Sequence, residues 1–144
     1  MMVALKKEFA EVNGMKKIKL IDSFGHAGEK NNRIYVIKDG VEPIYVGKAG
    51  KQQVGARVLH HIIDVFTDKK PSLISHYLFK AHPRYLDFDI DIYTSEEVTE
   101  LTKCKSSCLA CAEKEMYKLL LSRDIELKCN AIPPRDKCTC SESH

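Results

Sequence analysis

The stretch that decides the fold is residues 33–61, which read RIYVIKDGVEPIYVGKAGKQQVGARVLHH. Two near-copies of one tripeptide, Ile34–Val36 and Ile44–Val46, are short runs of β-branched and aromatic residues, a composition that favours strands. Residues 38–43, between the two runs, contain an Asp-Gly turn signal and a proline. The stretch therefore predicts an antiparallel hairpin that displays two phenols.

A helix is predicted directly after the hairpin, over Val54–Phe66. Its apolar residues recur at three- and four-residue steps, which is the pattern of a helix face that meets a core. Arg57 and His61 lie four residues apart beside that face, so they share one side of the helix. Asp64 lies one turn beyond His61 and could orient the imidazole. The residues of the apolar face are Val54, Val58, Ile62 and Val65.

A hairpin with two tyrosines, followed by a helix with an arginine and a histidine, resembles the GIY-YIG nuclease family. That family is named after Gly-Ile-Tyr and Tyr-Ile-Gly signatures on two adjacent strands. Here the signatures are Arg33–Tyr35 and Tyr45–Gly47, with arginine in place of the first glycine and Val46 in place of isoleucine. The resemblance covers residues 33–130 and implies a small α+β nuclease domain.

The resemblance also assigns residues outside the hairpin. Arg57 and His61 stand where the family has its helix arginine and histidine, and Glu115 and Asn130 follow in the order of its metal-binding glutamate and late asparagine. Glu113 is the competing glutamate, because both acids flank the apolar stripe of the same helix. The distance to Asn130 favours Glu115.

The chemistry implied by the resemblance is hydrolysis of DNA phosphodiester bonds. Glu115 is expected to hold Mg²⁺ or Mn²⁺, a hard cation that prefers oxygen ligands. Arg57 is expected to fork onto the phosphate oxygens. Either Tyr35 or Tyr45 is expected to deprotonate the attacking water, which requires a cation to lower a phenol pKa that is ordinarily near 10.

Further roles at the site follow from the same resemblance. Lys48 is placed to lower the tyrosine pKa, and His61 to hydrogen-bond a tyrosine or take the proton. Gly47 is expected to leave room for the DNA backbone, which Arg33 and Lys48 also contact. Asn130 is expected to brace the site.

The remaining chain supplies the third strand and further helices. Residues 71–80 predict a short helix, and residues 86–93 alternate apolar residues with aspartates across a strand. The aspartates, Asp87, Asp89 and Asp91, are predicted to form a solvated face rather than a metal site. The fold class is therefore α+β, with a central antiparallel three-stranded sheet formed by the hairpin 33–46 and strand 86–93, flanked by helices.

Length and composition predict one domain over residues 1–144, with an N-terminal extension over 1–32 and a cysteine-containing tail over 131–144. Residues 16–21 show weak strand alternation, and Ser95 begins a pattern typical of a helix start. The net charge of +3 permits DNA binding without requiring it. No apolar run is long enough for a membrane span or a signal peptide, so we expect a cytoplasmic protein, either monomer or homodimer.

Six cysteines leave one question open. A structural zinc site is one possibility, with thiolates that tie the tail to a helix start. Its ligands are Cys104, Cys108, Cys138 and Cys140. Cys111 and Cys129 are expected to be free thiols packed as small apolar groups, and disulfides are not expected in the cytoplasm.

Two other functional classes stay open beside the nuclease. The first is a catalytically inactive nucleic-acid-binding module, in which Arg33 blocks the cleft. The second is a zinc-organised interaction protein, in which the tyrosine hairpin is only structural.

Overall fold

The structure is a computed structural model that describes residues 15–67, 69–102 and 108–130. These residues form four strands and four α-helices, with short 3-10 helices between them. The elements are β1 (Lys16–Lys19), η1 (Leu20–Phe24), η2 (His26–Gly28), β2 (Arg33–Asp39), β3 (Glu42–Ala49), α2 (Val54–Thr67), α3 (Leu73–Lys80), η3 (Arg84–Asp87), β4 (Asp89–Tyr93), α4 (Ser95–Thr102) and α5 (Leu109–Ser122).

One antiparallel sheet in the order β1-β4-β2-β3 lies at the centre of the fold. The α+β class and the hairpin are confirmed, but the expectation of three strands is wrong. The fourth strand, β1, pairs with β4 from Lys16↔Ile92 to Lys19↔Asp89. Its short alternating segment forms a strand because β4 offers it an open edge.

The hairpin closes through a tight turn at Gly40 and Val41, where Gly40 has φ +65°. This left-handed backbone is readily available only to glycine and a few polar residues. The register shifts between Ile37 and Lys38, so that Ile37 pairs with Tyr45 and Lys38 pairs with Pro43. Both strands extend further toward the turn than the tripeptides alone indicated.

The strand predicted over 86–93 is shorter, because Arg84–Asp87 forms η3 and β4 begins at Asp89. The prediction of a solvated aspartate face is wrong for Asp91, which is buried and pairs with Lys38 at 2.8 Å. The reason is that β4 lies between β1 and β2, where both faces of the sheet are covered.

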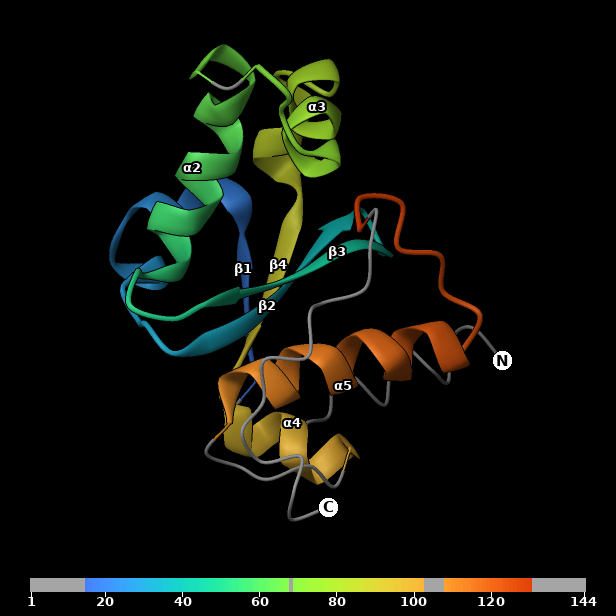
Figure 1. Ribbon diagram of the computed structural model, residues 1–144. Coiled ribbons are helices and arrows are strands. Elements are labelled where there is room, and N and C mark those ends of the chain that lie inside the picture. Colours follow the sequence, from blue (N-terminus) through green and yellow to red (C-terminus); the bar gives the residue numbers. More distant parts are fainter. Residues whose placement is uncertain (1–14, 68, 103–107, 131–144) are drawn as a thin grey trace.

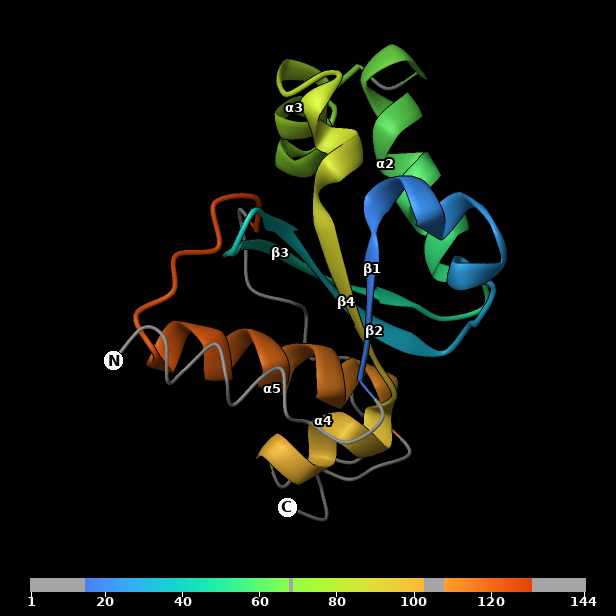
Figure 2. The same ribbon diagram turned by 180° about the vertical axis from the view of Figure 1, so that it is seen from behind.

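Helices cover the two faces of the sheet in separate pairs. Helices α2 and α3 lie on one face, and α4 and α5 lie on the other, as both views show (Figure 1, Figure 2). The predicted helix over 54–66 is confirmed as α2, and Ser72 caps α3 by accepting a hydrogen bond from the Ser75 N–H. Helix α4 begins with a reciprocal cap between Thr94 and Glu97.

Each face of the sheet has its own buried core. The core under α2 and α3 includes Leu20, Tyr35, Ile37, Ile44, Val54, Val58, Ile74, Leu78, Phe88, Ile90 and Ile92. The core under α4 and α5 includes Ile34, Val36, Val46, Tyr93, Val98, Ala112, Met116, Leu120 and Leu127. Among the described helices, none has the length and apolarity needed to cross a membrane.

Candidate active site

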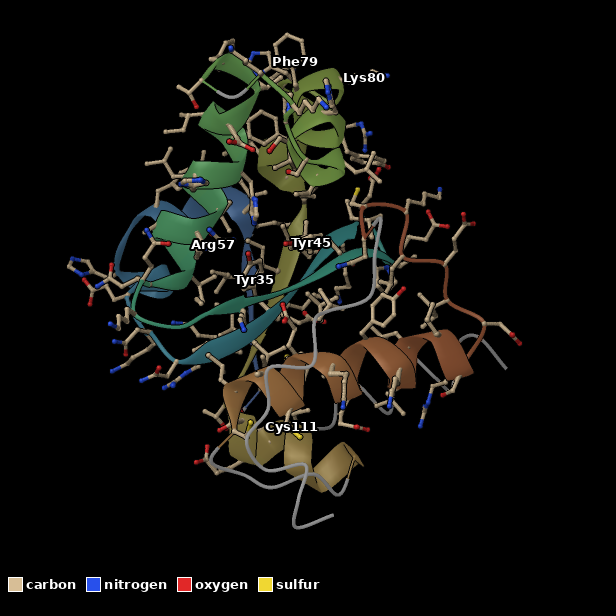
Figure 3. The ribbon with its side chains drawn as sticks, in the orientation of Figure 1. Tyr35, Tyr45, Arg57, Phe79, Lys80 and Cys111 are labelled. Atoms are coloured by element: carbon tan, nitrogen blue, oxygen red, sulfur yellow. The ribbon has the colours of Figure 1, made fainter. Side chains whose placement is uncertain are left out.

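The two hairpin tyrosines project from the face of the sheet that α2 covers (Figure 3). Tyr35 on β2 pairs across the strands with Gly47 of β3, and Tyr45 lies two residues before Gly47 on the same face. The two ring centroids are 6.1 Å apart. Tyr35 is fully buried, whereas Tyr45 keeps part of its surface in contact with solvent.

Gly47 is required by the two phenols. A Cβ at this position would lie 2.6 Å from the Tyr35 hydroxyl oxygen and 2.7 Å from the Tyr45 ring. The side-chain space that the glycine leaves is filled by the phenols, and the expectation that Gly47 leaves room for the DNA backbone stays a prediction. The glycine of the second signature, Tyr45–Gly47, is thus needed to make room for Tyr35 of the first signature.

Helix α2 brings His61 against both phenols. His61 is buried, its Nε2 is hydrogen-bonded to the Tyr35 hydroxyl at 2.8 Å, and its ring meets Tyr45 edge-on with centroids 5.2 Å apart. Arg57, one turn earlier, interacts electrostatically with both tyrosines. Asp64 does not orient His61, since its carboxylate instead accepts a hydrogen bond from Ser75 at 3.4 Å.

The position of α2 depends on close packing at its first turn. A Cβ on Gly55 would lie 1.9 Å from the Ser23 carbonyl oxygen, and a Cβ on Gly28 would lie 2.0 Å from the same atom. Two glycines therefore let η1, η2 and the start of α2 touch backbone to backbone. This contact fixes where the helix delivers Arg57 and His61.

Burial sets the protonation of the site in the protein alone. It lowers the pKa of His61 to about 3, with help from the charges of Arg57 and His60, so the imidazole is neutral. Burial also raises the pKa of Tyr35 and of Tyr45, and it outweighs the opposing effect of Arg57 on both phenols. Both tyrosines are therefore protonated, and neither is a base without a further cation.

The structure brings Glu113, rather than Glu115, to this site. Burial raises the pKa of Glu113, opposed by the nearby charges of Lys48 and Arg57, and Glu113 in turn raises the pKa of both tyrosines. Glu115 lies two residues further along α5 and faces Lys118 at 4.0 Å. The preference for Glu115 taken from chain spacing is not supported by this placement.

Asn130 braces β3 with both ends of its amide. Its Oδ1 accepts from the Val46 N–H at 2.9 Å, and its Nδ2 donates to the Val46 carbonyl at 3.1 Å. The N–H of Cys129 donates to the Ile44 carbonyl at 2.9 Å. The Asn130 amide thus pairs with the backbone of Val46 as a neighbouring strand would. Val46 lies between Tyr45 and Gly47, so the amide supports both of these site residues.

Arg33 is held at the start of β2. Its Nη1 donates to the carbonyls of Asn31 and Asn32 at 3.0 and 3.1 Å. The guanidinium is thereby directed back to the preceding loop, and no ring or ion-pair contact with the tyrosines or Glu113 is seen within the described residues.

The cysteines require two corrections. Cys111 is disulfide-bonded, so the expectations of a free thiol at this position and of a chain without disulfides are both wrong, whereas Cys108 and Cys129 are reduced. Cys108 caps α5, where its Sγ accepts from the Cys111 N–H at 3.3 Å. The other three cysteines of the suggested zinc quartet lie outside the described residues.

The donor set near Glu113 fits a cation that keeps most of its water ligands. No cluster of three or more His, Cys, Asp or Glu side chains occurs within the described residues. The carboxylate of Glu113 is partly buried and makes no hydrogen bond or ion pair to the part of the chain that the structure describes. One such carboxylate suits Mg²⁺, which binds proteins through one or two carboxylates together with phosphate oxygens and water.

Comparisons of this chain with protein-family models, with curated proteins and with solved structures found no match. The geometry of the site is therefore the basis for any functional conclusion.

Proposed function

We propose that this protein is a metal-dependent endonuclease that hydrolyses DNA phosphodiester bonds in the cytoplasm, as its resemblance to the GIY-YIG family suggests. The observation that supports the proposal is the convergence, from four elements, of five side chains with complementary chemistry. These are Tyr35 from β2, Tyr45 from β3, Arg57 and His61 from α2, and Glu113 from α5.

The charges at the site suit a phosphodiester. Arg57 presents planar donors that match the oxygens of a phosphate group. Lys48 adds a second cation beside Glu113. Glu113 would hold a divalent ion, and that ion would supply stabilisation of the charge that develops on the phosphate and on the leaving oxygen. The two cations, Arg57 and Lys48, thus lie near the carboxylate of Glu113 without a direct ion pair within the described residues. Both cations can therefore bind a phosphate, and the carboxylate can bind a metal ion.

The two phenols take different roles in the proposal. Tyr45 is the one that reaches solvent, so it is the tyrosine able to accept a proton from an attacking water. Tyr35 is fully buried and hydrogen-bonded to His61, and its interaction with Tyr45 lowers the pKa of Tyr45. Tyr35 therefore favours the deprotonated form of Tyr45, and His61 positions both phenols. This assignment separates two tyrosines that the sequence left equivalent.

The inactive binding module loses support from the placement of Arg33. That alternative required the guanidinium to block the cleft, whereas Arg33 bonds to the backbone carbonyls of its own loop.

The test is cleavage of supercoiled plasmid with Mg²⁺, with and without EDTA, by the wild type and by Arg57→Ala, Glu113→Gln and Glu115→Gln. We expect Mg²⁺-dependent nicking by the wild type. Loss of the guanidinium or of the metal-binding carboxylate should reduce the rate at least ~100-fold, as removal of a charge-stabilising group does in other enzymes. Glu115→Gln is the matched control on the same helix and should keep wild-type activity.

Two results would contradict the proposal. Failure of the wild type to cut supercoiled, linear or branched DNA would favour the binding module. Loss of activity in Glu115→Gln but not in Glu113→Gln would return the metal to Glu115. Because burial disfavours the charged form of Glu113, Glu113→Gln should unfold no more easily than the wild type at pH 7, so misfolding does not explain its inactivity.

A further inference from the structure

Helix α2 has a second apolar stripe, on the side that faces solvent. The stripe consists of Ala56, Leu59, Ile63 and Phe66, all of them exposed. Its steps of three, four and three residues are those of the a and d positions of a coiled coil, the narrow seam along which two helices pair. The inner stripe of α2 already contacts the sheet, so the outer one is not needed for the core.

Helix α3 extends the stripe at one end. Phe79 packs edge-on against Phe66, with ring centroids 5.7 Å apart, and the two side chains are 53% and 72% exposed. Figure 3 shows Phe79 near the outer end of α3, far from the labelled tyrosines. Two phenylalanines that pack together in solvent shield one another only in part, and a second surface would cover both.

We propose that the outer stripe is a self-association surface, on which α2 of one chain pairs antiparallel with α2 of a second copy. A twofold axis near residue 61 places the large Phe66 opposite the small Ala56 of the second copy, and Leu59 opposite Ile63. Two-fold interfaces must be self-complementary in this way. The four stripe residues carry no charge, so pairing them buries no ionised side chain of the stripe.

The area of the surface sets the strength of the pairing. An aromatic side chain buries 150–250 Å², so the exposed parts of Phe66 and Phe79 amount to roughly 200–300 Å². Leu59 and Ile63 add their exposed halves. The total falls short of the roughly 800 Å² per partner of a standard interface. The dimer should therefore be weak and concentration-dependent.

The pairing leaves the candidate active site open. Arg57 and His61 project from the side of α2 that faces the hairpin, whereas the outer stripe points the other way. Self-association is independent of the proposed nuclease function, because its test measures mass rather than cleavage.

The experiment is sedimentation velocity of the full chain from ~1 µM to ~1 mM, the range in which a small interface dissociates. The wild type should shift from monomer toward dimer. Phe66→Glu should raise the dissociation constant at least ~10-fold, the equivalent of 1.4 kcal/mol. Val41→Glu is the matched control, because Val41 is 62% exposed at the hairpin turn, away from α2.

A charge swap tests the antiparallel register. Ala56→Lys and Phe66→Glu should each weaken the dimer, and the double variant should recover it, because the new charges then face each other across the axis. A wild type that stays monomeric at every concentration would overturn the proposal and leave the stripe to a different protein. A dimer whose dissociation constant is unchanged by both substitutions would also overturn the proposal. This includes a dimer linked by an intermolecular disulfide, which would dissociate on reduction.

Discussion

The two faces of the sheet bury ionisable groups in different ways. On the α5 face, Lys38 and Asp91 form a 2.8 Å ion pair in which each charge neutralises the other. On the α2 face, His61 is buried beside cations, with no opposite charge among the groups that shift its pKa. The first arrangement is a closed ion pair, although Asp91 Oδ1 is buried without a hydrogen-bond partner in the described part of the chain. In the second, His61 stays neutral, and Arg57 and Glu113 form no ion pair with each other within the described residues.

The contrast shows how burial alone fails to identify a functional site. Both faces contain a group whose pKa is lowered by burial, namely Lys38 and His61. For Lys38 the carboxylate of Asp91 acts in the opposite direction and raises the pKa. Perturbed groups occur in structural ion pairs as well as in active sites. What distinguishes the candidate site is that the cation Arg57, from α2, and the carboxylate of Glu113, from α5, lie close enough for their charges to interact but form no ion pair with each other within the described residues.

The largest expected effect on stability is that of Asp91→Ala. It leaves the Lys38 ammonium buried without its partner, and breaking a buried pair costs about 3 kcal/mol or more. Urea unfolding followed by circular dichroism measures the loss. Asp89→Ala is the control on the same strand, since its partner Lys19 is half exposed and such a pair contributes at most about 1 kcal/mol. Equal losses in the two variants would mean that Lys38 reaches water.

A smaller effect is expected from Gly47→Ala, which tests whether the α2 face is as tightly built as the contacts indicate. The new methyl group collides with the Tyr35 hydroxyl and the Tyr45 ring, and overpacking of this kind costs about 1–3 kcal/mol. Gly50→Ala is the control, because its nearest neighbour, a methyl of Leu109, lies 3.9 Å away. Unfolding free energies that match in the two variants would show that the phenols move aside easily.

The sequence predicted the elements that depend on local patterns of residues, namely the hairpin and α2. The hairpin follows from an Asp-Gly turn between two β-branched runs, and α2 follows from its apolar periodicity, so Tyr35, Tyr45, Arg57 and His61 were brought together as expected. These residues lie within 30 positions of one another. Few long-range contacts are needed to place them.

What the sequence could not predict depends on distant partners. Asp91 looked solvent-facing because its burial requires β1 and β2 on either side of β4, together with the helices of the α5 face. Glu113 and Glu115 flank the buried stripe of Ala112 and Met116 symmetrically, so periodicity cannot tell which one faces β3. Only the docking of α5 against the hairpin makes that choice. The disulfide of Cys111 likewise lacks a local signal.

The last prediction concerns pH and tests the other half of the comparison. The pKa of His61 is about 3 in the folded protein, against 6.5 for an ordinary histidine. Between these two values the unfolded chain binds the proton and the folded chain does not, so stability falls as pH falls. The slope approaches about 1.4 kcal/mol per pH unit. Wild type and His61→Gln are compared by urea unfolding from pH 7 to pH 4.

His61→Gln should be less stable than the wild type at pH 7, because the Tyr35 hydroxyl loses its imidazole partner, yet its stability should fall less steeply toward pH 4. His76→Gln, a change at an exposed histidine, is the control for the substitution of an imidazole by an amide. All other titrating groups are common to the proteins, so the difference in slope belongs to His61. Parallel curves for wild type and His61→Gln would mean that the imidazole accepts a proton without unfolding, and that the α2 face contains a charged rather than a neutral histidine.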